Sequence, residues 1–181
     1  MTRPSDRALT LRPCGADDLP AVHAIYADAV RTGTASFELE PPTLEEMRGR
    51  WAALAEAGYP YLVALSGGAV AGYAYAGAYR PRPAYRGTVE NSVYVRAGCR
   101  GAGVGRALLA ELIARCEAAG FRQMVAVIGD SDNHGSIGLH RALGFADVGV
   151  LRAVGWKHGR WLDTVLMQRP LGAGDTIPFG G

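Results

Sequence analysis

A glycine-rich turn bracketed by arginines is the segment of this sequence with the most definite chemistry. It reads Arg100-Gly101-Ala102-Gly103-Val104-Gly105-Arg106 and stands between an extended run, 88–95, and an amphipathic helical pattern. Glycines leave no Cβ between ligand and backbone, so successive N–H groups can face an anion where a helix N-terminus already favours negative charge. With two guanidinium groups beside it, the turn predicts a binding site for a diphosphate.

Two other nucleotide-binding motifs fit this turn less well. A Walker loop has Lys followed by Ser or Thr after its last glycine, whereas this chain has Arg106 and Ala107. The dinucleotide-binding fingerprint spaces its glycines as G-x-G-x-x-G and needs an acidic residue about 20 residues further on, but Asp130 comes later than that. The arginines also favour a bound phosphate over an empty tight turn.

The elements that would position this turn follow from the periodic pattern. Alternating or apolar runs predict strands over residues 9–12, 61–65, 70–79, 88–95, 124–128, 147–152 and 163–168. Helices are expected to begin after Asp17 or Asp18, at a capping box from Thr43 to Glu46, at Gly103, and at Asn133. We expect a mixed α/β fold with an antiparallel meander, a crossover helix and a parallel neighbour.

The bulk composition indicates one domain with a small-molecule partner. The 181 residues carry a formal net charge of +2, and the basic residues are scattered, which argues against nucleic-acid binding. No apolar run approaches the length of about 18 residues needed to span a membrane, and no apolar signal-peptide core is present. Three cysteines without a CxxC pair favour a reducing, cytoplasmic location. We expect one domain over residues 1–171 and a flexible tail over 172–181.

The glycine turn resembles the acetyl-CoA loop of the GNAT superfamily of N-acetyltransferases. Arg100, Gly103 and Gly105 meet the family pattern R/Q-x-x-G-x-G/A, and the likeness extends over most of the chain. The segments TVENSVYV, RPAY (82–85), VAVIG, LHRALGF and GWKHGRW are similar to those of the phosphinothricin and methionine sulfoximine acetyltransferases. The resemblance implies the GNAT sheet, in which the fourth and fifth strands, here 88–95 and 124–128, splay apart around the pantetheine arm of acetyl-CoA.

The resemblance also implies which residues would bind acetyl-CoA. The backbone of Val93, Tyr94 and Val95 would bond the pantetheine arm as if it were another strand, although an ordinary paired strand is the alternative. The diphosphate would lie against the turn that comprises Arg100, Gly101, Ala102, Gly103, Val104, Gly105 and Arg106. Asn133 would cap the next helix, contact the CoA arm, or do both.

Two side chains are candidates for moving protons during acetyl transfer to an amine. An α-amine with a pKa near 8 is only about one-tenth neutral at pH 7, so it has to lose a proton before attack. Glu90 shares a strand face with Thr88, Ser92 and Tyr94, and the resemblance places the family's general base there. At the position of His140, many relatives carry a tyrosine that acts as the acid. The phosphinothricin branch carries a histidine there, as this chain does. The alternatives are a solvated carboxylate and a helix histidine bonded to a carbonyl.

The resemblance further implies an acceptor pocket near a contact between two subunits. By resemblance it would be lined by Phe37, Arg82, Ala84 and Tyr85. A guanidinium suits a substrate carboxylate because its planar fork binds both oxygens, while a solvated side chain is the alternative. The branch is dimeric, so we expect a homodimer. The pattern does not separate pocket closure from a dimer contact for three residues near the C-terminus, Trp156, Lys157 and Trp161.

The residues and the resemblance lead to three hypotheses on function. The first is transfer of acetyl from acetyl-CoA to the α-amino group of a small amino-acid analogue such as phosphinothricin, methionine sulfoximine or methionine sulfone. The second keeps the chemistry but changes the acceptor to a protein N-terminus, a lysine, an aminoglycoside or a polyamine. The third is a non-catalytic module that binds acetyl-CoA. No metal is expected because the four histidines lack ligand spacing.

Overall fold

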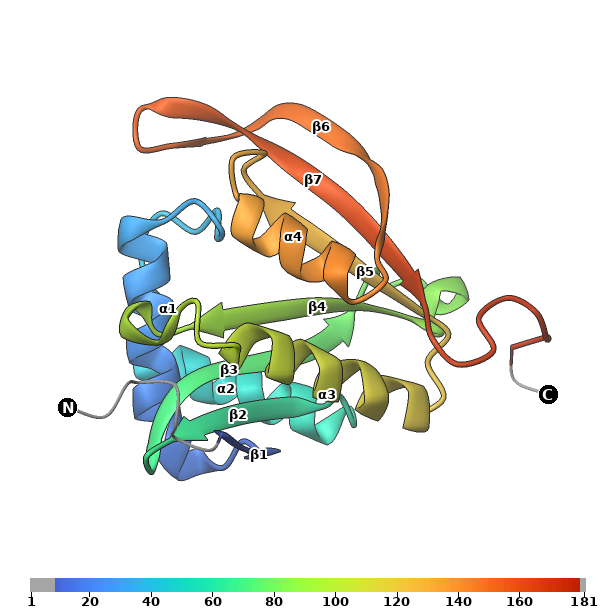
Figure 1. Cartoon of the computed structure of the whole chain (residues 1–181), viewed down its shortest axis with the longest axis horizontal. Coiled ribbons are helices and arrows are strands. Elements are labelled where there is room, and N and C mark those ends of the chain that lie inside the picture. The colour runs from blue at the N-terminus through green and yellow to red at the C-terminus, as the bar shows by residue number, and fades with distance from the viewer. Residues whose placement is uncertain (1–8, 180–181) are drawn as a thin grey trace.

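One seven-stranded sheet organises the protein (Figure 1). The structure is a computed structural model that describes residues 9–179. The strand order is β1-β2-β3-β4-β5-β7-β6, and every neighbouring pair is antiparallel except β4 and β5, which confirms the expected mixed sheet. The strands are Leu9–Pro13 (β1), Tyr61–Ser66 (β2), Ala69–Ala78 (β3), Thr88–Val95 (β4), Gln123–Gly129 (β5), Ala146–Lys157 (β6) and Arg160–Pro170 (β7).

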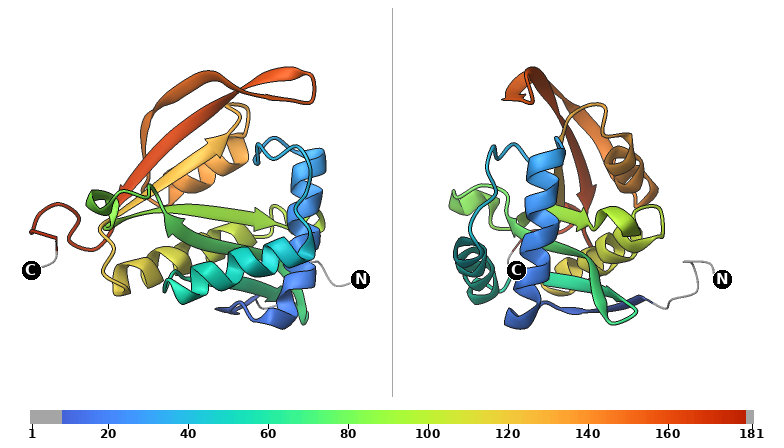
Figure 2. Two further views of the ribbon diagram at one scale, coloured as in Figure 1. Left: turned by 180° about the vertical axis from the view of Figure 1, so that it is seen from behind. Right: turned by 90° about the vertical axis from the view of Figure 1, so that its left-hand side faces the viewer.

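Helices cover both faces of this sheet (Figure 2). One face carries α1 (Leu19–Thr32) and α2 (Leu44–Glu56), and the other carries α3 (Val104–Ala118) and α4 (His134–Ala142). The expected capping box opens α2, where the Thr43 hydroxyl accepts from Glu46 N and the Glu46 carboxylate accepts from Thr43 N. These bonds satisfy N–H groups that the first turn leaves free.

The start of α1 is stabilised differently from the expectation. Asp18 is the N-cap residue, but its side chain makes no capping bond. Its carboxylate accepts from the Arg12 guanidinium at 2.6 Å and from Gly15 N at 2.8 Å. The bond with Arg12 lowers the pKa of Asp18 below its ordinary value. Asp18 therefore ties β1 to α1 and does not satisfy the end of the helix.

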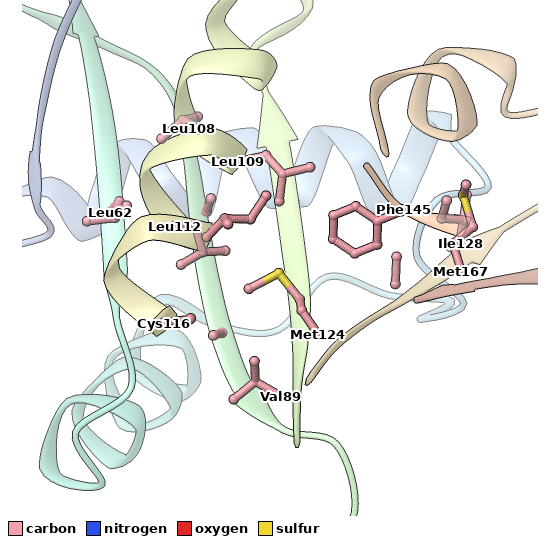
Figure 3. Close-up of a cluster of buried hydrophobic side chains, with 14 of the residues drawn as sticks. Leu62, Val89, Leu108, Leu109, Leu112, Cys116, Met124, Ile128, Phe145 and Met167 are labelled. Atoms are coloured by element: carbon pink, nitrogen blue, oxygen red, sulfur yellow. The ribbon is translucent and has the colours of Figure 1, made fainter. Parts of the chain in front are cut away.

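The main hydrophobic core lies between α3 and the sheet (Figure 3). Leu108, Leu109 and Leu112 of α3 are fully buried, and they lie beside Val89 of β4 and Met124 of β5. Truncating one of these leucines to alanine would cost about 2–5 kcal/mol. This packing fixes the N-terminus of α3, and with it the glycine turn, beside the end of β4.

The strands β4 and β5 pair over only their first halves. The parallel register runs from Thr88 with Gln123 to Asn91 with Ala126 and ends there. Residues 92–95 stay paired with β3 alone, and residues 127–129 with β7 alone. Figure 1 shows the two strands diverging from this point toward the side where α3 begins. The splay between the fourth and fifth strands is confirmed.

The strands β6 and β7 are longer than the pattern predicts and protrude from the molecule as a hairpin (Figures 1 and 2). The expected segment 147–152 lies in the first half of Ala146–Lys157, and the expected segment 163–168 is the middle part of Arg160–Pro170. Every residue of β6 except Gly155 and Lys157 is exposed, and the β6–β7 register shifts twice. β6 therefore lacks the alternation of buried and exposed residues by which a half-buried strand is recognised.

Turns follow β7 as far as residue 179. The Arg86 guanidinium lies 5.0 Å from the centroid of the Phe179 ring, which also packs against Gly87. The division into a domain over 1–171 and a tail over 172–181 reaches residues outside the described range at both ends, and it stays a prediction. Within residues 9–179, no helix combines the length and the apolar character needed to cross a membrane.

Candidate active site

The turn before α3 leaves backbone N–H groups free. Gly101 and Gly103 have φ values of +75° and +80°, in the left-handed region that strains residues with a Cβ. No side chain caps α3, and an added Cβ at either glycine would meet nothing within 4 Å. Backbone conformation and not crowding therefore requires these glycines. The N–H groups at the start of α3 lie open to an anion.

A cleft of about 710 Å³ extends from this turn into the gap between β4 and β5. Its volume is in the range of pockets that hold small molecules and cofactors. Ala102 is exposed and does not line it. The other residues predicted to bind the cofactor all do: Val93, Tyr94, Val95, Arg100, Gly101, Gly103, Val104, Gly105, Arg106 and Asn133. Asn133 is also a helix cap, since its Oδ1 accepts from Ser136 N at 3.2 Å.

Part of the β4 backbone is available to a ligand in this gap. Arg96 N donates to Ala71 O on β3 at 2.9 Å. Because peptide groups alternate in direction along a strand, Val95 and Val93 direct their N–H and C=O groups into the gap. Tyr94 directs its backbone toward β3 and its ring toward α1. Two of the three expected backbone positions therefore face the cleft.

Glu90 lies on the face of β4 that looks toward α1 and α2. Its cross-strand partner on β3 is Gly77, which has no side chain, and its partner on β5 is Val125. Burial raises the pKa of Glu90 above 4.5, and the charge of Arg80 opposes this shift. A half-buried carboxylate with a raised pKa suits a group that accepts a proton near neutral pH.

His140 lies on the opposite face of β4, in α4, and only 3% of its surface is exposed. Nδ1 lies 2.8 Å from the Ser136 carbonyl oxygen, and Nε2 lies 3.0 Å from Oδ1 of Asn91. The Asn91 amide nitrogen donates to Val125 O at 3.2 Å, which leaves Oδ1 as an acceptor. A neutral imidazole has one N–H, so it can donate to only one of these two oxygens. Burial lowers the pKa of His140 below 6.5, although its bond with Ser136 opposes this.

A pocket of about 50 Å³ adjoins the cleft beside this histidine. Asn91, Ser92, Ser136 and His140 line it, together with residues 126–129 of β5. It shares Val93, Tyr94 and Asn133 with the large cleft. The small pocket thus continues the gap toward the point where β4 and β5 begin to pair. Within residues 9–179, no three side chains of the metal-binding types gather as a ligand set.

The residues predicted for the acceptor are not brought together in one described cavity. Phe37 belongs to the loop between α1 and α2, whereas Arg82, Ala84 and Tyr85 belong to the exposed loop before β4. Ala84 lines a separate cavity of about 350 Å³ beneath the C-terminal turns. The other three line none of the three cavities. Both loops lie on the side of the sheet that carries α1 and α2 (Figure 2). Glu90 faces the same side, because strand alternation places it with Tyr94, whose ring packs against Tyr26 of α1.

Several residues at this site escaped the sequence reasoning. Asn91 had a signal, because it is a polar residue on a strand face that otherwise carries Val89, Val93 and Val95. Thr34 and Ala35 line the cleft from the loop after α1, and no local pattern marks them.

Comparison with known proteins agrees with this geometry. The Acetyltransferase (GNAT) family profile matches residues 22–145. The chain is 60% identical to phosphinothricin N-acetyltransferase of Alcaligenes faecalis, over 93% of this chain and 86% of that protein. It is 49% identical to the L-methionine sulfoximine/L-methionine sulfone acetyltransferase of Pseudomonas paraeruginosa, over 88% of this chain and 92% of that protein.

A solved relative contains the co-substrate. The crystal structure of a GNAT superfamily phosphinothricin acetyltransferase from Sinorhizobium meliloti in complex with acetyl-CoA superposes with a TM-score of 0.92. That protein is 52% identical to this chain, and the match covers 94% of this chain and 92% of the other. The cleft, the uncapped helix and the splayed strands of this chain fit the same ligand. The protein therefore belongs to the GNAT acetyltransferase family, as an acetyl-CoA-dependent N-acetyltransferase.

Proposed function

We propose that this enzyme acetylates the α-amino group of a small amino-acid analogue such as phosphinothricin, methionine sulfoximine or methionine sulfone, with Glu90 as general base. The observation that carries the proposal is the position of Glu90. It lies one residue before the point where β4 and β5 separate, on the sheet face opposite α3, with a raised pKa. The acceptor specificities of the relatives from Alcaligenes faecalis and Pseudomonas paraeruginosa support this substrate class.

The two proposed catalytic side chains act from opposite faces of β4. Glu90 takes a proton from the incoming ammonium on the α1 and α2 side, directly or through water. The neutral amine then attacks the thioester carbon, which lies in the gap. On the other face, the neutral ring of His140 lines the small pocket that continues the gap and donates a hydrogen bond to the sulfur as the C–S bond breaks, and the thiolate takes its proton from the attacking nitrogen. The free N–H groups of the glycine turn hold the diphosphate and thereby the thioester in place.

Cations on the acceptor side support a substrate that carries a carboxylate. Arg80 is near enough to Glu90 for its charge to oppose the rise in the pKa of that group. Arg82 follows two residues later on the same exposed loop. An amino-acid analogue presents a carboxylate next to its α-amine, so one guanidinium can bind the acid while Glu90 takes the proton from the amine. A polyamine would be repelled by the same two arginines.

A screen of acceptors tests the proposed substrate class. Purified enzyme with acetyl-CoA is offered phosphinothricin, methionine sulfoximine and methionine sulfone, and separately a lysine peptide, an aminoglycoside and spermidine. Released thiol gives the rate, and mass spectrometry gives the acetylated nitrogen. The proposal predicts kcat/KM values that are highest for the three amino-acid analogues, with the acetyl group on the α-nitrogen. Faster turnover of the lysine peptide, the aminoglycoside or spermidine would contradict it.

We also propose that a second copy of the chain covers the exposed apolar surface of the β6–β7 hairpin. Soluble monomers rarely expose so many large apolar side chains on one element. The surface comprises Val148, Val150, Leu151, Val154, Trp156 and Trp161, of which Trp161 is 62% exposed. Light scattering of the wild type should give the mass of a dimer, and Trp161→Glu should give a monomer. A wild-type monomer at micromolar concentration would contradict this proposal.

A further inference from the structure

Lys157 is an unusual residue for its position. Of the 19 lysine and arginine residues, it is the single lysine. Within residues 9–179 it is also the one lysine or arginine that is buried, with 4% of its surface exposed. It ends β6, a strand in which every other residue except Gly155 is exposed. A buried cation at such a place calls for a specific partner.

The partner of Lys157 is a backbone carbonyl. Nζ donates to Ser36 O at 2.7 Å, in the loop between α1 and α2. Lys157 forms no ion pair with any described carboxylate. Burial lowers the pKa of Lys157, and the charge of Glu38, itself paired with Arg50 at 2.6 Å, opposes the shift. Burying a charge for one neutral acceptor costs stability, so the contact is poorly explained as a device to stabilise the fold.

Ser36 belongs to a segment, 33–37, that is bonded to neighbouring elements at both Gly33 and Ser36. The Ser36 hydroxyl bonds the Tyr26 hydroxyl at 3.0 Å and accepts from Glu38 N at 3.2 Å. His158, next to Lys157, lies 3.3 Å from Gly33 O through its Nε2. Two β6–β7 residues therefore bond to backbone carbonyls of the 33–37 segment.

Glycines allow the 33–37 segment to lie directly on the sheet. A Cβ at Gly129, the last residue of β5, would overlap Thr34 O and would meet Ala35 O at 3.0 Å. A Cβ at Gly155 of β6 would overlap the Phe37 ring. The segment is thus seated on the end of β5 and on the hairpin, with no room for a side chain at either contact.

The 33–37 segment lies where acetyl-CoA and the acceptor would meet. Gly33, Thr34 and Ala35 line the 710 Å³ cleft, and Ala35 lines the small pocket beside His140 as well. Phe37, two residues further, turns toward the hairpin on the acceptor side. A movement of the segment would therefore change the cofactor cleft and the acceptor side together.

We propose that Lys157 is a positioning residue for acetyl transfer. Its ammonium holds the 33–37 segment against β5, and the segment in turn closes the acyl end of the cofactor cleft and presents Phe37 to the acceptor. The inference rests on the proposed function only in what it says of the acceptor. Lys157 acts through the segment and touches neither substrate.

Replacing Lys157 by methionine tests this role with a side chain of similar length and no charge. The lost charge-assisted bond is expected to raise amide hydrogen exchange in residues 33–38 by roughly tenfold to hundredfold. The KM for the acceptor should rise in the Lys157→Met enzyme, while the melting temperature stays the same or increases because a buried charge is removed. Arg31→Met is the matched control, since Arg31 is an exposed cation two residues before the segment.

The outcomes separate a positioning role from a general structural role. Unchanged exchange in residues 33–38, or an unchanged acceptor KM, would overturn the proposal. A fall in melting temperature with faster exchange throughout α3 would overturn it as well, because Lys157 would then stabilise the whole fold. If the wild type turns over no acceptor, the proposed function fails, and the exchange data still decide whether Lys157 holds the segment.

The wild-type protein offers a second test, because a single lysine can be followed without ambiguity. Reductive methylation of Lys157, read from its peptide by mass spectrometry, should be at least about tenfold slower than that of Nα-acetyl-lysine. Acetyl-CoA should slow it further, since a ligand on the cleft wall stabilises the seated segment. Methylation as fast as that of the free amino acid, or a rate that acetyl-CoA does not change, would overturn the proposal.

Discussion

Replacing Glu90 by glutamine removes the proposed base and keeps the size of the side chain. A positioned general base contributes about 10²–10⁴ in rate, so kcat should fall by that factor. The KM for acetyl-CoA should barely change, because Glu90 faces α1 and α2 and does not line the cofactor cleft. Glu90→Asp withdraws the carboxylate by about 1.5 Å and should give an intermediate loss.

The raised pKa of Glu90 predicts how both activity and stability should change with pH. In the wild type the acid limb of kcat/KM should lie above pH 4.5, because burial moves the pKa of Glu90 upward from that value. The folded protein then binds a proton more tightly than the unfolded chain, so stability falls as pH rises from 4.5 through the folded pKa. Glu90→Gln lacks this loss, so it should be more stable than the wild type at pH 7 and no more stable below pH 4.5.

The assay combines steady-state thiol release across a pH series with urea unfolding of the same preparations. A slow variant that is also more stable at pH 7 separates lost chemistry from misfolding. The reasoning is refuted if Glu90→Gln keeps most of the wild-type kcat with phosphinothricin, or if the acid limb persists in the variant.

Three further changes test other parts of the site. Arg100→Ala should raise the KM for acetyl-CoA by about tenfold with little change in kcat, an effect that shrinks in high salt; an unchanged KM would exclude Arg100 from diphosphate binding. Gly103→Ala should cost about 1–2 kcal/mol in urea unfolding because its φ is +80°, whereas Gly49→Ala in the middle of α2 should add stability, and equal effects would contradict a conformational cause. The wild type should lose stability as pH falls below 6.5, because the histidine of the unfolded chain takes up a proton before the buried His140 does, and His140→Gln should lack this loss. Identical profiles of stability against pH for the two proteins would mean that His140 is not buried as a neutral ring.

The parts of the fold that were predicted from sequence are those with local signals. The bounds of β4 match residue for residue, and α3 follows Gly103 as expected, because glycines and apolar spacing mark both ends. The capping box at Thr43 is likewise a property of four consecutive residues. β6 was predicted too short because its residues are exposed, so no burial pattern marks where the strand continues.

Contacts between residues far apart in sequence account for what was missed. Asn91 and His140 are 49 residues apart, and Lys157 and Ser36 are 121 residues apart. The sequence around each of these residues gives no indication of its partner, because only the folded structure brings the two members of a pair together. The side chain of Asp18 shows the same effect, since a tertiary pair with Arg12 replaced the helix cap that its position suggests.

A crystal structure of the enzyme with acetyl-CoA tests the central claim most directly. The account predicts the diphosphate against the N–H groups that follow Gly103, the pantetheine arm along Val93 and Val95, and the thioester beside the small pocket of His140. Density for the co-substrate elsewhere on the molecule, or side chains of the protein filling the gap between β4 and β5, would contradict it.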